Sequence, residues 1–421
     1  MTIIDKLLMQ FCPNGVEYKT LGELGTFLGG LSGKSKEDFK NGNAKFITYM
    51  NVFNNIQLKL DVTDSVKINE GEKQNTIQYG DVLFTGSSET PNECGMSSVL
   101  TEKTDEKLYL NSFCFIYRFD DPELFLPSFS KYLFRSEALR KQIIKTASGV
   151  TRFNVSKAKM AKVKIPVPPL EVQSEIVKIL DNFTELTAEL SEELTARKKQ
   201  YEYYRDLLLN LDVRGGGQRE HKWRKIKLLD MLSQPITDGP HTTPTFVDKG
   251  IPFVSVDSVW DGKIHFENMR GYITEEFDLE CCKKYKPQKH DVYMVKSGST
   301  TGKVAYVDTD ERFNIWSPLA AMRVNEHHSS RYLFHLLQTN HIQELVKTKS
   351  SHGSQPNLSM RELEKFEVIV PPLEEQTRIV NILDRFDKLC NDICEGMPAE
   401  IEARRKQYEY YRDKLLTFKE V

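Results

Sequence analysis

The sequence predicts a mixed α/β chain with an internal pseudo-twofold repeat. Two α+β domains would alternate with two long helices that pair as an antiparallel coiled coil. The segment ARKKQYEYYRD at 196–206 returns as ARRKQYEYYRD at 403–413 with ten of eleven positions identical, and we call this segment the signature. Upstream of each signature stands a second shared segment, PPLEVQSEIVKILD at 168–181 and PPLEEQTRIVNILD at 371–384. Because self-similarity at a fixed period indicates a repeat architecture, the chain is two versions of one half.

The repeat divides the chain of 421 residues into four parts. We expect a first domain at 1–166, a first long helix at 167–213, a second domain at 214–368 and a second long helix at 369–421. The glycine-rich run at 214–217 is typical of a flexible link.

Within the first domain, runs rich in β-branched and aromatic residues predict strands at 46–52, 82–85, 113–119 and 163–167. Apolar residues at helical spacing predict one amphipathic helix over 128–146. The second domain repeats this outline in four places. FVSVDSVWDG (253–262) matches FITYMNVFNN (46–55), HDVYMV (290–295) matches GDVLFT (80–85), a helix near 330–349 matches that of the first domain, and PNLS (356–359) matches FNVS (153–156).

Both shared regions are predicted to be long helices, because their apolar positions advance by alternating steps of four and three, the spacing of a heptad seam. The first seam runs through Ile176, Leu180, Phe183, Leu190, Leu194, Tyr201, Tyr204, Leu208 and Leu211, with Thr187 and Arg197 filling the gaps. The second runs through Ile379, Leu383, Phe386, Cys390, Ile393, Met397, Ile401, Arg404, Tyr408, Tyr411, Leu415 and Phe418. One extra step of four, from Met397 to Ile401, is a stutter. Gly396 and Pro398 at the same point predict a local bend.

The signature repeats more than packing requires. A seam needs apolar residues, but four polar positions off the seam recur as well. Repeated surface chemistry indicates a repeated partner, so we expect these side chains to bind a partner protein. They are Lys199, Gln200, Glu202 and Arg205 in the first copy and Lys406, Gln407, Glu409 and Arg412 in the second. The alternative is that the paired helices are purely structural.

Composition excludes several classes of function. The net charge of −2 excludes a globally basic nucleic-acid binder. No apolar run is long enough to span a membrane, and residues 1–10 lack a signal-peptide pattern. The seven cysteines form no CxxC pair, so we expect neither a disulfide framework nor a structural zinc, and a cytoplasmic location. All nine histidines lie at or beyond His221, which excludes a metal site or a histidine chemistry shared by both halves.

The sequence offers no cofactor or catalytic motif. GGLSGKS at 29–35 resembles a phosphate-binding loop, but the Walker pattern requires a glycine where Leu28 stands. The double prolines do not form the N/D-P-P-Y/F motif of amino-methyltransferases, because valine precedes them at Val167 and Val370. No nucleophile, base and orienting residue can be placed together. We therefore predict no catalytic residues, no metal and no cofactor.

Charge is distributed unevenly along the chain. Residues 131–164 contain ten Lys or Arg against Glu137 alone, and residues 281–303 contain six lysines against Asp291. A run of charge is usually a solvated face, but one acid among so many bases departs from a balanced surface. We therefore expect phosphate contacts here, with SGVTRFN at 148–154 as a polar loop beside the first cluster.

Taken together, these features resemble the specificity (S) subunit of type I restriction–modification systems. The resemblance rests on the paired PPLExQ segments, TELTAELSEEL (184–194), the two signatures, CPNGVEY (12–18) and DGPHTTPTFVDKGIPFVSV (238–256), and it covers nearly the whole chain. It implies a non-catalytic subunit whose two target recognition domains each read one half of a bipartite DNA site. The helices would act as a spacer and dock two methyltransferase (modification) subunits, which restriction subunits then join.

If the helices are antiparallel, the two domains meet double-stranded DNA at two separated major-groove positions. The half-sites should differ because the domains differ. We expect the DNA contacts on polar loop residues of both domains. They are Lys34, Ser35, Lys36, Ser87, Ser88, Lys141, Lys145, Arg152 and Asn154 in the first domain, and His241, Thr242, Thr243, Lys296, Ser297, Ser299, Thr300, Lys303, Gln355 and Asn357 in the second.

The competing interpretation is a self-contained DNA methyltransferase or nuclease. Such an enzyme would need a glycine-rich cofactor loop or a carboxylate–lysine cluster, and the sequence contains neither. Co-purification with a methyltransferase distinguishes the two interpretations, because only a specificity subunit requires that partner.

Overall fold

The computed structural model describes residues 3–209, 223–351, 355–391 and 396–421. They form two compact units. Unit 1 consists of Met1–Glu189 and Glu402–Val421, and unit 2 consists of Leu190–Ile401. Each unit therefore contains a globular part and helix segments from both repeats. The flexible link predicted at 214–217 and the seam residue Leu211 lie outside the described residues.

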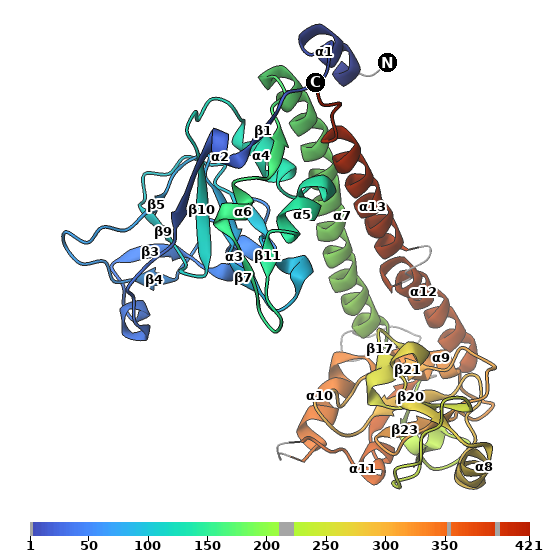
Figure 1. Cartoon of the computed structure of the whole chain (residues 1–421). Helices are drawn as coiled ribbons and strands as arrows, with labels where there is room; N and C mark the ends of the chain where they lie inside the picture. Colours follow the sequence, from blue (N-terminus) through green and yellow to red (C-terminus); the bar gives the residue numbers. More distant parts are fainter. Residues whose placement is uncertain (1–2, 210–222, 352–354, 392–395) are drawn as a thin grey trace. The chain divides into compact units, whose positions relative to one another are not determined.

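The first long helix is α7 (Leu170–Leu209), which is continuous over 40 residues (Figure 1). It begins directly after the double proline, where the carbonyl of Pro169 accepts the amide of Gln173 at 3.0 Å. The second long helix consists of two pieces, α12 (Leu373–Asn391) and α13 (Met397–Leu415). The predicted bend falls at this interruption, of which residues 392–395 lie outside the described part.

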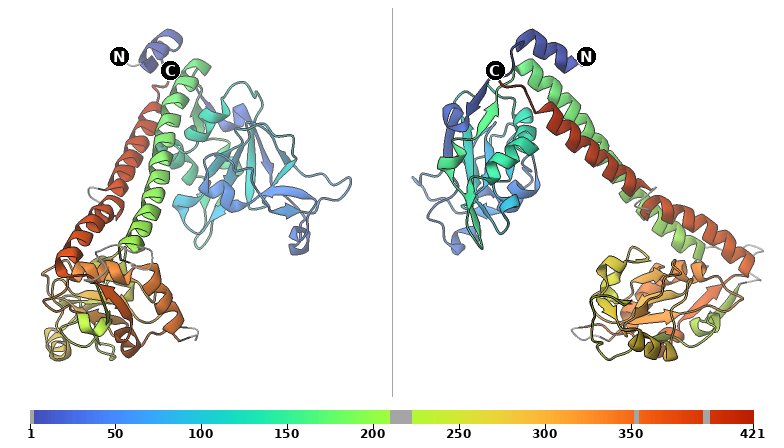
Figure 2. Two further views of the ribbon diagram at one scale, coloured as in Figure 1. Left: turned by 180° about the vertical axis from the view of Figure 1, so that it is seen from behind. Right: turned by 45° about the vertical axis from the view of Figure 1, so that its right-hand side comes forward.

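The long helices pair with their aromatic seam residues in contact, as the heptad spacing predicts. In unit 2 the second half of α7 packs against α12, where Tyr204 stacks on Phe386 with ring centroids 5.8 Å apart. In unit 1 the first half of α7 packs against α13, where Phe183 stacks on Tyr411 at 5.4 Å (Figure 2). Since early α7 meets late α13 and late α7 meets α12, the pairing is antiparallel. Phe183 corresponds to Phe386 and Tyr204 to Tyr411 in the repeat, so one contact is made twice with the repeats exchanged.

The globular part of unit 1 contains two four-stranded sheets. The first has the antiparallel order β2-β10-β6-β8, formed by β2 (Gly25–Gly29), β10 (Cys114–Phe119), β6 (Val82–Thr85) and β8 (Ser97–Val99). The second has the order β4-β3-β9-β5, formed by β4 (Ser65–Val66), β3 (Ala44–Ile47), β9 (Leu108–Leu110) and β5 (Thr76–Ile77), with β3 and β9 parallel. Beside them, β1 (Tyr18–Thr20) pairs with β13 (Lys164–Pro166), and α1 (Ile3–Phe11) and α2 (Leu21–Leu24) flank β1 in the chain.

Unit 2 repeats this topology. Its main sheet has the order β15-β23-β20-β21, formed by β15 (Thr237–Asp238), β23 (Leu319–Met322), β20 (Val292–Val295) and β21 (Val304–Tyr306). A second sheet contains the parallel pair β16 (Ile251–Val254) and β22 (Asn314–Ile315) with β19 (Gly271–Ile273), and α8 (Glu275–Lys284) follows β19. Finally, β14 (Arg224–Lys227) pairs with β24 (Glu367–Val370), and β17 (Val259–Trp260) pairs with β18 (Lys263–Ile264). The match of strand order confirms the internal repeat.

Most predicted strands of the first domain are confirmed by β6, β10 and β13. The strand predicted over 46–52 is wrong in its second half, because β3 ends at Ile47 and a helix, α3 (Tyr49–Asn54), follows. The hydroxyl of Thr48 accepts the amide of Asn51 at 3.3 Å and so caps this helix. The β-branched and aromatic residues of this stretch favour a strand throughout, so they do not predict the transition from strand to helix.

The single helix predicted over 128–146 is also wrong, since the structure has two helices, α4 (Pro127–Leu133) and α5 (Glu137–Ile144). The second domain has the same division into α9 (Ser330–Leu337) and α10 (Asn340–Lys349). At each break a hydroxyl donates back to a carbonyl of the preceding turn, Ser136 to Leu133 at 2.7 Å and Thr339 to Leu336 at 2.8 Å. The helical spacing of apolar residues continues across each break, because both helices of the pair bury their apolar side chains in the same core.

The matched tetrads FNVS and PNLS take the same structural role. Ser156 caps α6 (Lys157–Met160) by accepting the amide of Lys159 at 3.3 Å. Ser359 caps α11 (Met360–Glu364) by accepting the amide of Glu362 at 3.2 Å. These caps confirm the match between the two segments.

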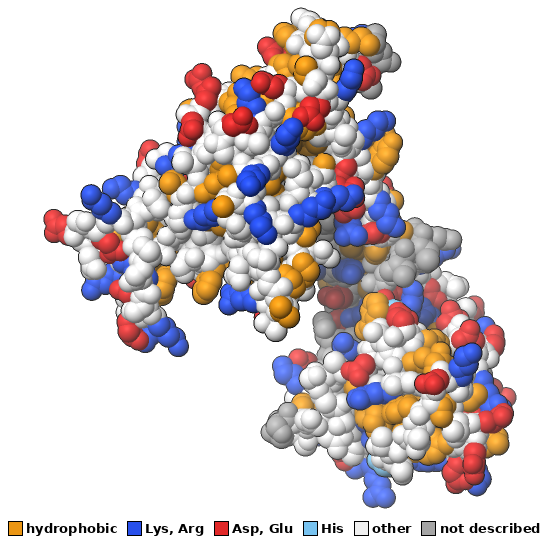
Figure 3. Space-filling view, in the orientation of Figure 1, with side chains coloured by type: hydrophobic (Ala, Val, Ile, Leu, Met, Phe, Trp, Pro, Cys, Tyr) orange, Lys and Arg blue, Asp and Glu red, His pale blue; other side chains and the backbone are white. Residues whose placement is uncertain are grey.

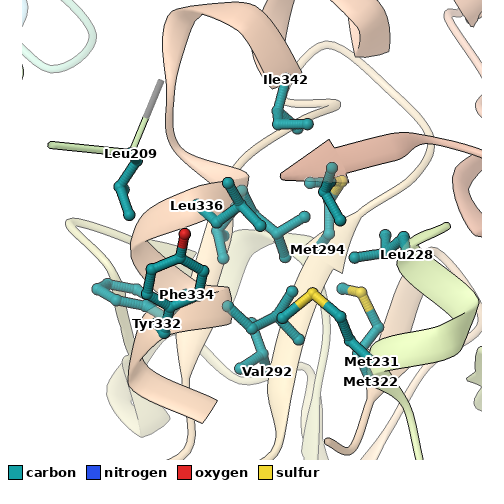
Figure 4. Close-up of a cluster of buried hydrophobic side chains, with 14 of the residues drawn as sticks. Leu209, Leu228, Met231, Val292, Met294, Met322, Tyr332, Phe334, Leu336 and Ile342 are labelled. Atoms are coloured by element: carbon teal, nitrogen blue, oxygen red, sulfur yellow. The ribbon is translucent and has the colours of Figure 1, made fainter. Parts of the chain in front are cut away.

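Each unit has its own core. In unit 2, residues of α7, α9, the main sheet and the short 3-10 helix Leu228–Met231 bury their apolar side chains together (Figure 4). Among them are Leu209, Met231, Val292, Met294, Met322, Tyr332 and Phe334. The glutamine of each PPLExQ segment is completely buried. Gln173 accepts the amide of Leu126 at 2.9 Å, and Gln376 accepts the amide of Ser329 at 2.8 Å. Because an unpaired buried amide is costly, this glutamine ties each long helix to its own domain.

Candidate nucleic-acid interface and helix signatures

Four of the predicted DNA-contacting residues of the first domain lie together in a small sheet of unit 1. This sheet has the order β11-β12-β7, formed by β11 (Ala147–Ser148), β12 (Phe153–Val155) and β7 (Ser87–Ser88). Asn154 lies opposite Ser87 in the antiparallel pair. The Arg152 guanidinium donates to the Ser87 hydroxyl through Nε at 3.2 Å and through Nη2 at 3.1 Å. Arg152 and Asn154 are exposed, whereas Ser87 is buried beneath them.

Apolar side chains accompany these polar groups. A cavity of about 850 Å³ is lined by Ser87, Ser88 and Arg152, and also by Tyr49, Met50, Phe53, Glu89, Glu93, Phe113, Val150 and Thr151. The Arg152 guanidinium lies 5.3 Å from the centre of the Phe113 ring. Phe113 is 56% exposed and Val150 is 91% exposed. Sequence reasoning missed Phe113, because an apolar residue at the start of a predicted strand is usually assigned to the core, and it missed Val150, because that residue lies in a loop selected for its polar side chains.

The second domain has a corresponding arrangement. Ser297 forms an antiparallel bridge with Asn357, the positions that match Ser87 and Asn154. The amide of Leu358 donates to the Lys296 carbonyl at 2.8 Å and so holds this bridge in place. A cavity of about 570 Å³ beside the bridge includes Ser299 in its lining. His241 lies 3.6 Å from Asp238, which also pairs with Lys296, the residue before Ser297. Ser299, Thr300 and Lys303 line a further cavity of about 460 Å³. The other predicted residues of this domain are exposed: Thr242, Thr243 and Gln355.

Two predicted DNA contacts are engaged inside the protein. Lys34 is bound to Glu72 at 2.6 Å and to the Lys67 carbonyl at 2.5 Å, and its side chain is only 6% exposed. Lys296 is 13% exposed and pairs with buried Asp238 at 3.2 Å. Both ammonium groups are therefore paired within the protein, and DNA contact by these two lysines stays a prediction. Ser35 is similarly occupied, because its hydroxyl and amide both bind Asp38, whereas Lys36 next to it is exposed.

The basic cluster at 131–164 is only partly a surface feature. Arg135 donates to the carbonyls of Val52, Phe53, Asn55 and Ser97 at 2.7–3.3 Å, and Arg140 donates to those of Asn92, Cys94 and Gly95 at 2.5–2.9 Å. Burial lowers the pKa of both guanidinium groups to about 10. These two residues hold loops together, which corrects the interpretation of the whole cluster as a phosphate-binding face. Lys141, paired with Glu137 at 2.5 Å, and Lys145 remain exposed, and Figure 3 shows Lys and Arg side chains over the region of α5 and α6.

The two signatures are only partly exposed. Lys199, Glu202, Lys406, Gln407 and Glu409 are exposed and Gln200 is half-buried. In contrast, the Arg205 side chain is only 9% exposed, and its guanidinium lies 5.4 Å from the Tyr201 ring centre. The Arg412 guanidinium likewise lies 5.7 Å from the Tyr408 ring centre. Arg205 and Arg412 are therefore largely covered within their own units, and partner binding by these two arginines stays a prediction.

A buried histidine links a signature to the second domain. The Tyr201 hydroxyl lies 3.1 Å from His335 Nδ1, and His335 Nε2 lies 2.6 Å from Asp384, which also pairs with Arg331 at 2.5 Å. Burial lowers the pKa of His335, and the hydrogen bonds from His335 and Arg331 lower the pKa of Asp384 against the opposing effect of burial. The neutral ring therefore donates from Nε2 to the carboxylate and accepts the phenol proton at Nδ1. The first domain has Tyr132 at this position, donating to Asp181 at 2.5 Å.

This histidine should make the stability of unit 2 depend on pH. The unfolded chain takes up a proton near the ordinary pKa of about 6.5, whereas the folded chain resists protonation. The stabilising contribution is therefore complete above that pH and is lost as the pH falls, by at most ~1.4 kcal/mol per pH unit for one proton. Urea unfolding at pH 7.5 and pH 5.5 measures how the free energy of unfolding changes with pH. The control variant His335→Tyr has the residue of the first domain at this position and should lose this pH dependence. If the free energy of unfolding changes equally with pH in the parent protein and the variant, His335 is not its source.

Other kinds of site are not found in the part of the chain that the structure describes. There, no group of three His, Cys, Asp or Glu residues is arranged to hold a metal ion. The cysteines within the described ranges are free thiols. Among the helices of those ranges, none has the length and apolar character to cross a membrane.

Comparisons with known proteins agree with these features. The chain matches the sequence family described as "Type I restriction modification DNA specificity domain" over residues 13–197 and 234–403, once in each repeat. It is 36% identical over 272 residues to the EcoR124I/EcoR124II specificity subunit of Escherichia coli, covering 63% of this chain and 65% of that one. It is also 36% identical over 282 residues to a putative type I specificity subunit of Haemophilus influenzae, covering 64% and 68%.

A similar fold is found among solved structures. A chain from a study of complex assembly and conformational transition of the type I R-M system aligns with a TM-score of 0.66 and 18% identity, covering 96% of this chain and 98% of that one. The family match covers most of each repeat and ends where each signature begins. This chain therefore belongs to the family of type I restriction–modification specificity subunits.

Proposed function

We propose that this chain is the DNA-recognition subunit of a type I restriction–modification complex, and that each globular domain reads one half of an asymmetric bipartite site. One observation carries the proposal. The two domains share their strand order, while the polar loops on that framework differ between them. Two copies of a framework with different loops are suited to reading two different short sequences, because base edges are distinguished by the side chains presented to them.

The proposed division of labour follows the repeat. Residues 1–166 and 214–368 are the target recognition domains, and residues 167–213 and 369–421 are the spacer helices. The exposed signature residues Lys199, Glu202, Lys406, Gln407 and Glu409, with half-buried Gln200, would dock two methyltransferase subunits, to which restriction subunits are added in the full complex. The proposal assigns no catalytic step, cofactor or metal to this chain, and it expects the complex in the cytoplasm.

The proposed reading surface of the first domain is the cluster around Arg152. An arginine beside Asn154 can donate to guanine or phosphate, and an asparagine can bind adenine. The exposed rings and methyl groups of Phe113 and Val150 offer apolar contact of the kind that thymine methyl groups make. Ser297 and Asn357 support an equivalent surface in the second domain.

The test is reconstitution. The purified chain alone should transfer no methyl groups, whereas the chain with its modification subunits and S-adenosylmethionine should methylate one bipartite sequence. Mapping modified bases across a random DNA library gives both half-sites and the spacer. Methyl transfer by the chain alone would instead favour a self-contained methyltransferase, and methylation at a single continuous sequence would contradict the two-domain assignment.

A further inference from the structure

The aspartate of each signature binds a domain helix of the other repeat. In unit 2, Asp206 of the first repeat accepts the backbone amide of Asn340, the first residue of α10, at 3.0 Å. In unit 1, Asp413 of the second repeat accepts the amide of Glu137, the first residue of α5, at 2.8 Å. Asp206 corresponds to Asp413 in the signatures, and Glu137 corresponds to Asn340 in the domains. The same bond is therefore formed twice, with the repeats exchanged.

These bonds satisfy a group that the domain cannot satisfy by itself. The residue that precedes a helix can accept the amide of its second or third residue through its side chain, but the amide of the first residue needs another acceptor. The Thr339 hydroxyl donates to the Leu336 carbonyl and accepts the amide of Ile342, the third residue of α10, at 3.5 Å, and the Ser136 hydroxyl donates to the Leu133 carbonyl. The amides of Glu137 and Asn340 are bound instead by the signature aspartates. A carboxylate at this end is further favoured by the helix dipole. In unit 1, Arg412 binds both oxygens of Asp413 at 2.9–3.0 Å and fixes its orientation.

A tyrosine of the same signature makes a second contact across the repeats. In unit 2, Tyr201 of the first repeat binds His335 of the second at 3.1 Å. In unit 1, the ring of Tyr408 packs against that of Tyr132 with centroids 6.3 Å apart. Tyr132 and His335 are corresponding positions, and each binds the aspartate at the end of its own PPLExQ segment, Asp181 or Asp384. Each domain is thus held between its own long helix and the signature of the other repeat.

The bound helices lead directly to the proposed reading surfaces. The end of α5 continues through Thr146, whose carbonyl accepts the amide of Ser156 at 3.2 Å, so the loop carrying Arg152 is closed on this helix. The end of α10 continues to Ser351, whose amide donates to the Asn357 carbonyl at 3.1 Å and whose hydroxyl accepts the Asn357 amide at 3.2 Å. A displacement of either helix therefore moves the residues that would meet DNA.

From these contacts we propose that each signature positions the recognition domain of the opposite repeat. Asp206 and Tyr201 hold the reading loops of the second domain, and Asp413 and Tyr408 hold those of the first. This inference rests on the proposed function. It also explains why tyrosine and aspartate recur in both signatures, and it leaves the exposed Lys, Gln and Glu positions for a partner.

The experiment compares Asp206→Ala with Asp413→Ala, each in complex with modification subunits. Hydrogen–deuterium exchange measures the first turns of α5 and α10. Photo-crosslinking of each half-site, followed by peptide mapping, identifies the domain that contacts it. Methylation is then measured on DNA with one base pair changed in one half-site.

Asp413→Ala should speed exchange in α5 about fivefold, the loss expected for one helix cap, and should reduce discrimination at the half-site of the first domain only. Asp206→Ala should give the mirror result in α10 and at the other half-site.

Two further variants separate positioning from general destabilisation. Asp206→Asn and Asp413→Asn keep an oxygen that can accept the helix amide, so they should restore both slow exchange and discrimination. Loss of discrimination at both half-sites, or faster exchange in the helix of the same repeat, would overturn the proposal. If exchange changes in the crossed pattern but neither half-site crosslinks, the positioning contacts stand and the proposed function fails. If crosslinking is normal and exchange is unchanged, the function stands and the positioning role fails.

Discussion

Insertion of one further TAEL tetrad after Leu190 should lengthen the unspecified spacer of the DNA site by one or two base pairs. Four residues add ~6 Å to α7 and rotate its continuation by ~400°, one full turn plus ~40°. The apolar seam therefore stays close to register, as it does when four residues are inserted into a heptad pattern. At ~3.4 Å per base pair, the added length corresponds to about two pairs. The original site should lose nearly all methylation, because no position of the complex then spans it.

The measurement is the map of methylated bases before and after the insertion. The bases of both half-sites should be unchanged, since the insertion touches neither domain. A matched control places the same four residues between Glu102 and Lys103, in an exposed loop of unit 1, and should leave the spacer as it was. An unchanged spacer in the α7 variant, or altered bases in a half-site, would refute a role of this helix in setting the distance.

Replacement of Arg135 by alanine should destabilise unit 1 by about 3 kcal/mol or more. The guanidinium binds four backbone carbonyls in a site largely shielded from water, and removal of the donor leaves those acceptors unpaired. Thermal or urea unfolding of the full chain reports the loss. Arg135→Lys should recover only part of it, because an ammonium group cannot match the fork of the guanidinium.

The contrasting variant is Arg152→Ala, a change of an exposed arginine from the same basic cluster. Its stability should fall by only about 1 kcal/mol, because the one group that it leaves unpaired is the Ser87 hydroxyl. DNA binding by the assembled complex should weaken, and for a lost phosphate contact the slope of log K against log salt should fall by about 0.9. If Arg152→Ala destabilises the fold as much as Arg135→Ala, the division of this cluster into structural and DNA-facing arginines is wrong.

The candidate site was harder to predict than the architecture. Ser87, Arg152, Ser297 and Asn357 were chosen as polar loop residues, and strand pairing brings them together in two corresponding places. Lys34 and Lys296 were chosen on the same grounds, yet acidic residues distant in the sequence bind them. A sequence shows which side chains are charged, but only the fold shows which charges already have partners.

The sequence by itself determined the internal repeat, the long helices, their aromatic seam and the family. These features depend on local periodicity and on identity between segments, both of which can be compared along the chain without knowledge of distant contacts. Only the tertiary structure shows which signature residues are covered and what they contact. Arg205 and Arg412 fall off the heptad seam, so sequence reasoning placed them on the surface, but the globular parts pack on that second face. The contact of Asp206 with α10 and of Asp413 with α5 joins residues separated by 134 and 276 positions. No periodic pattern records such a bond, because it depends on how a domain folds back onto the helix of the other repeat.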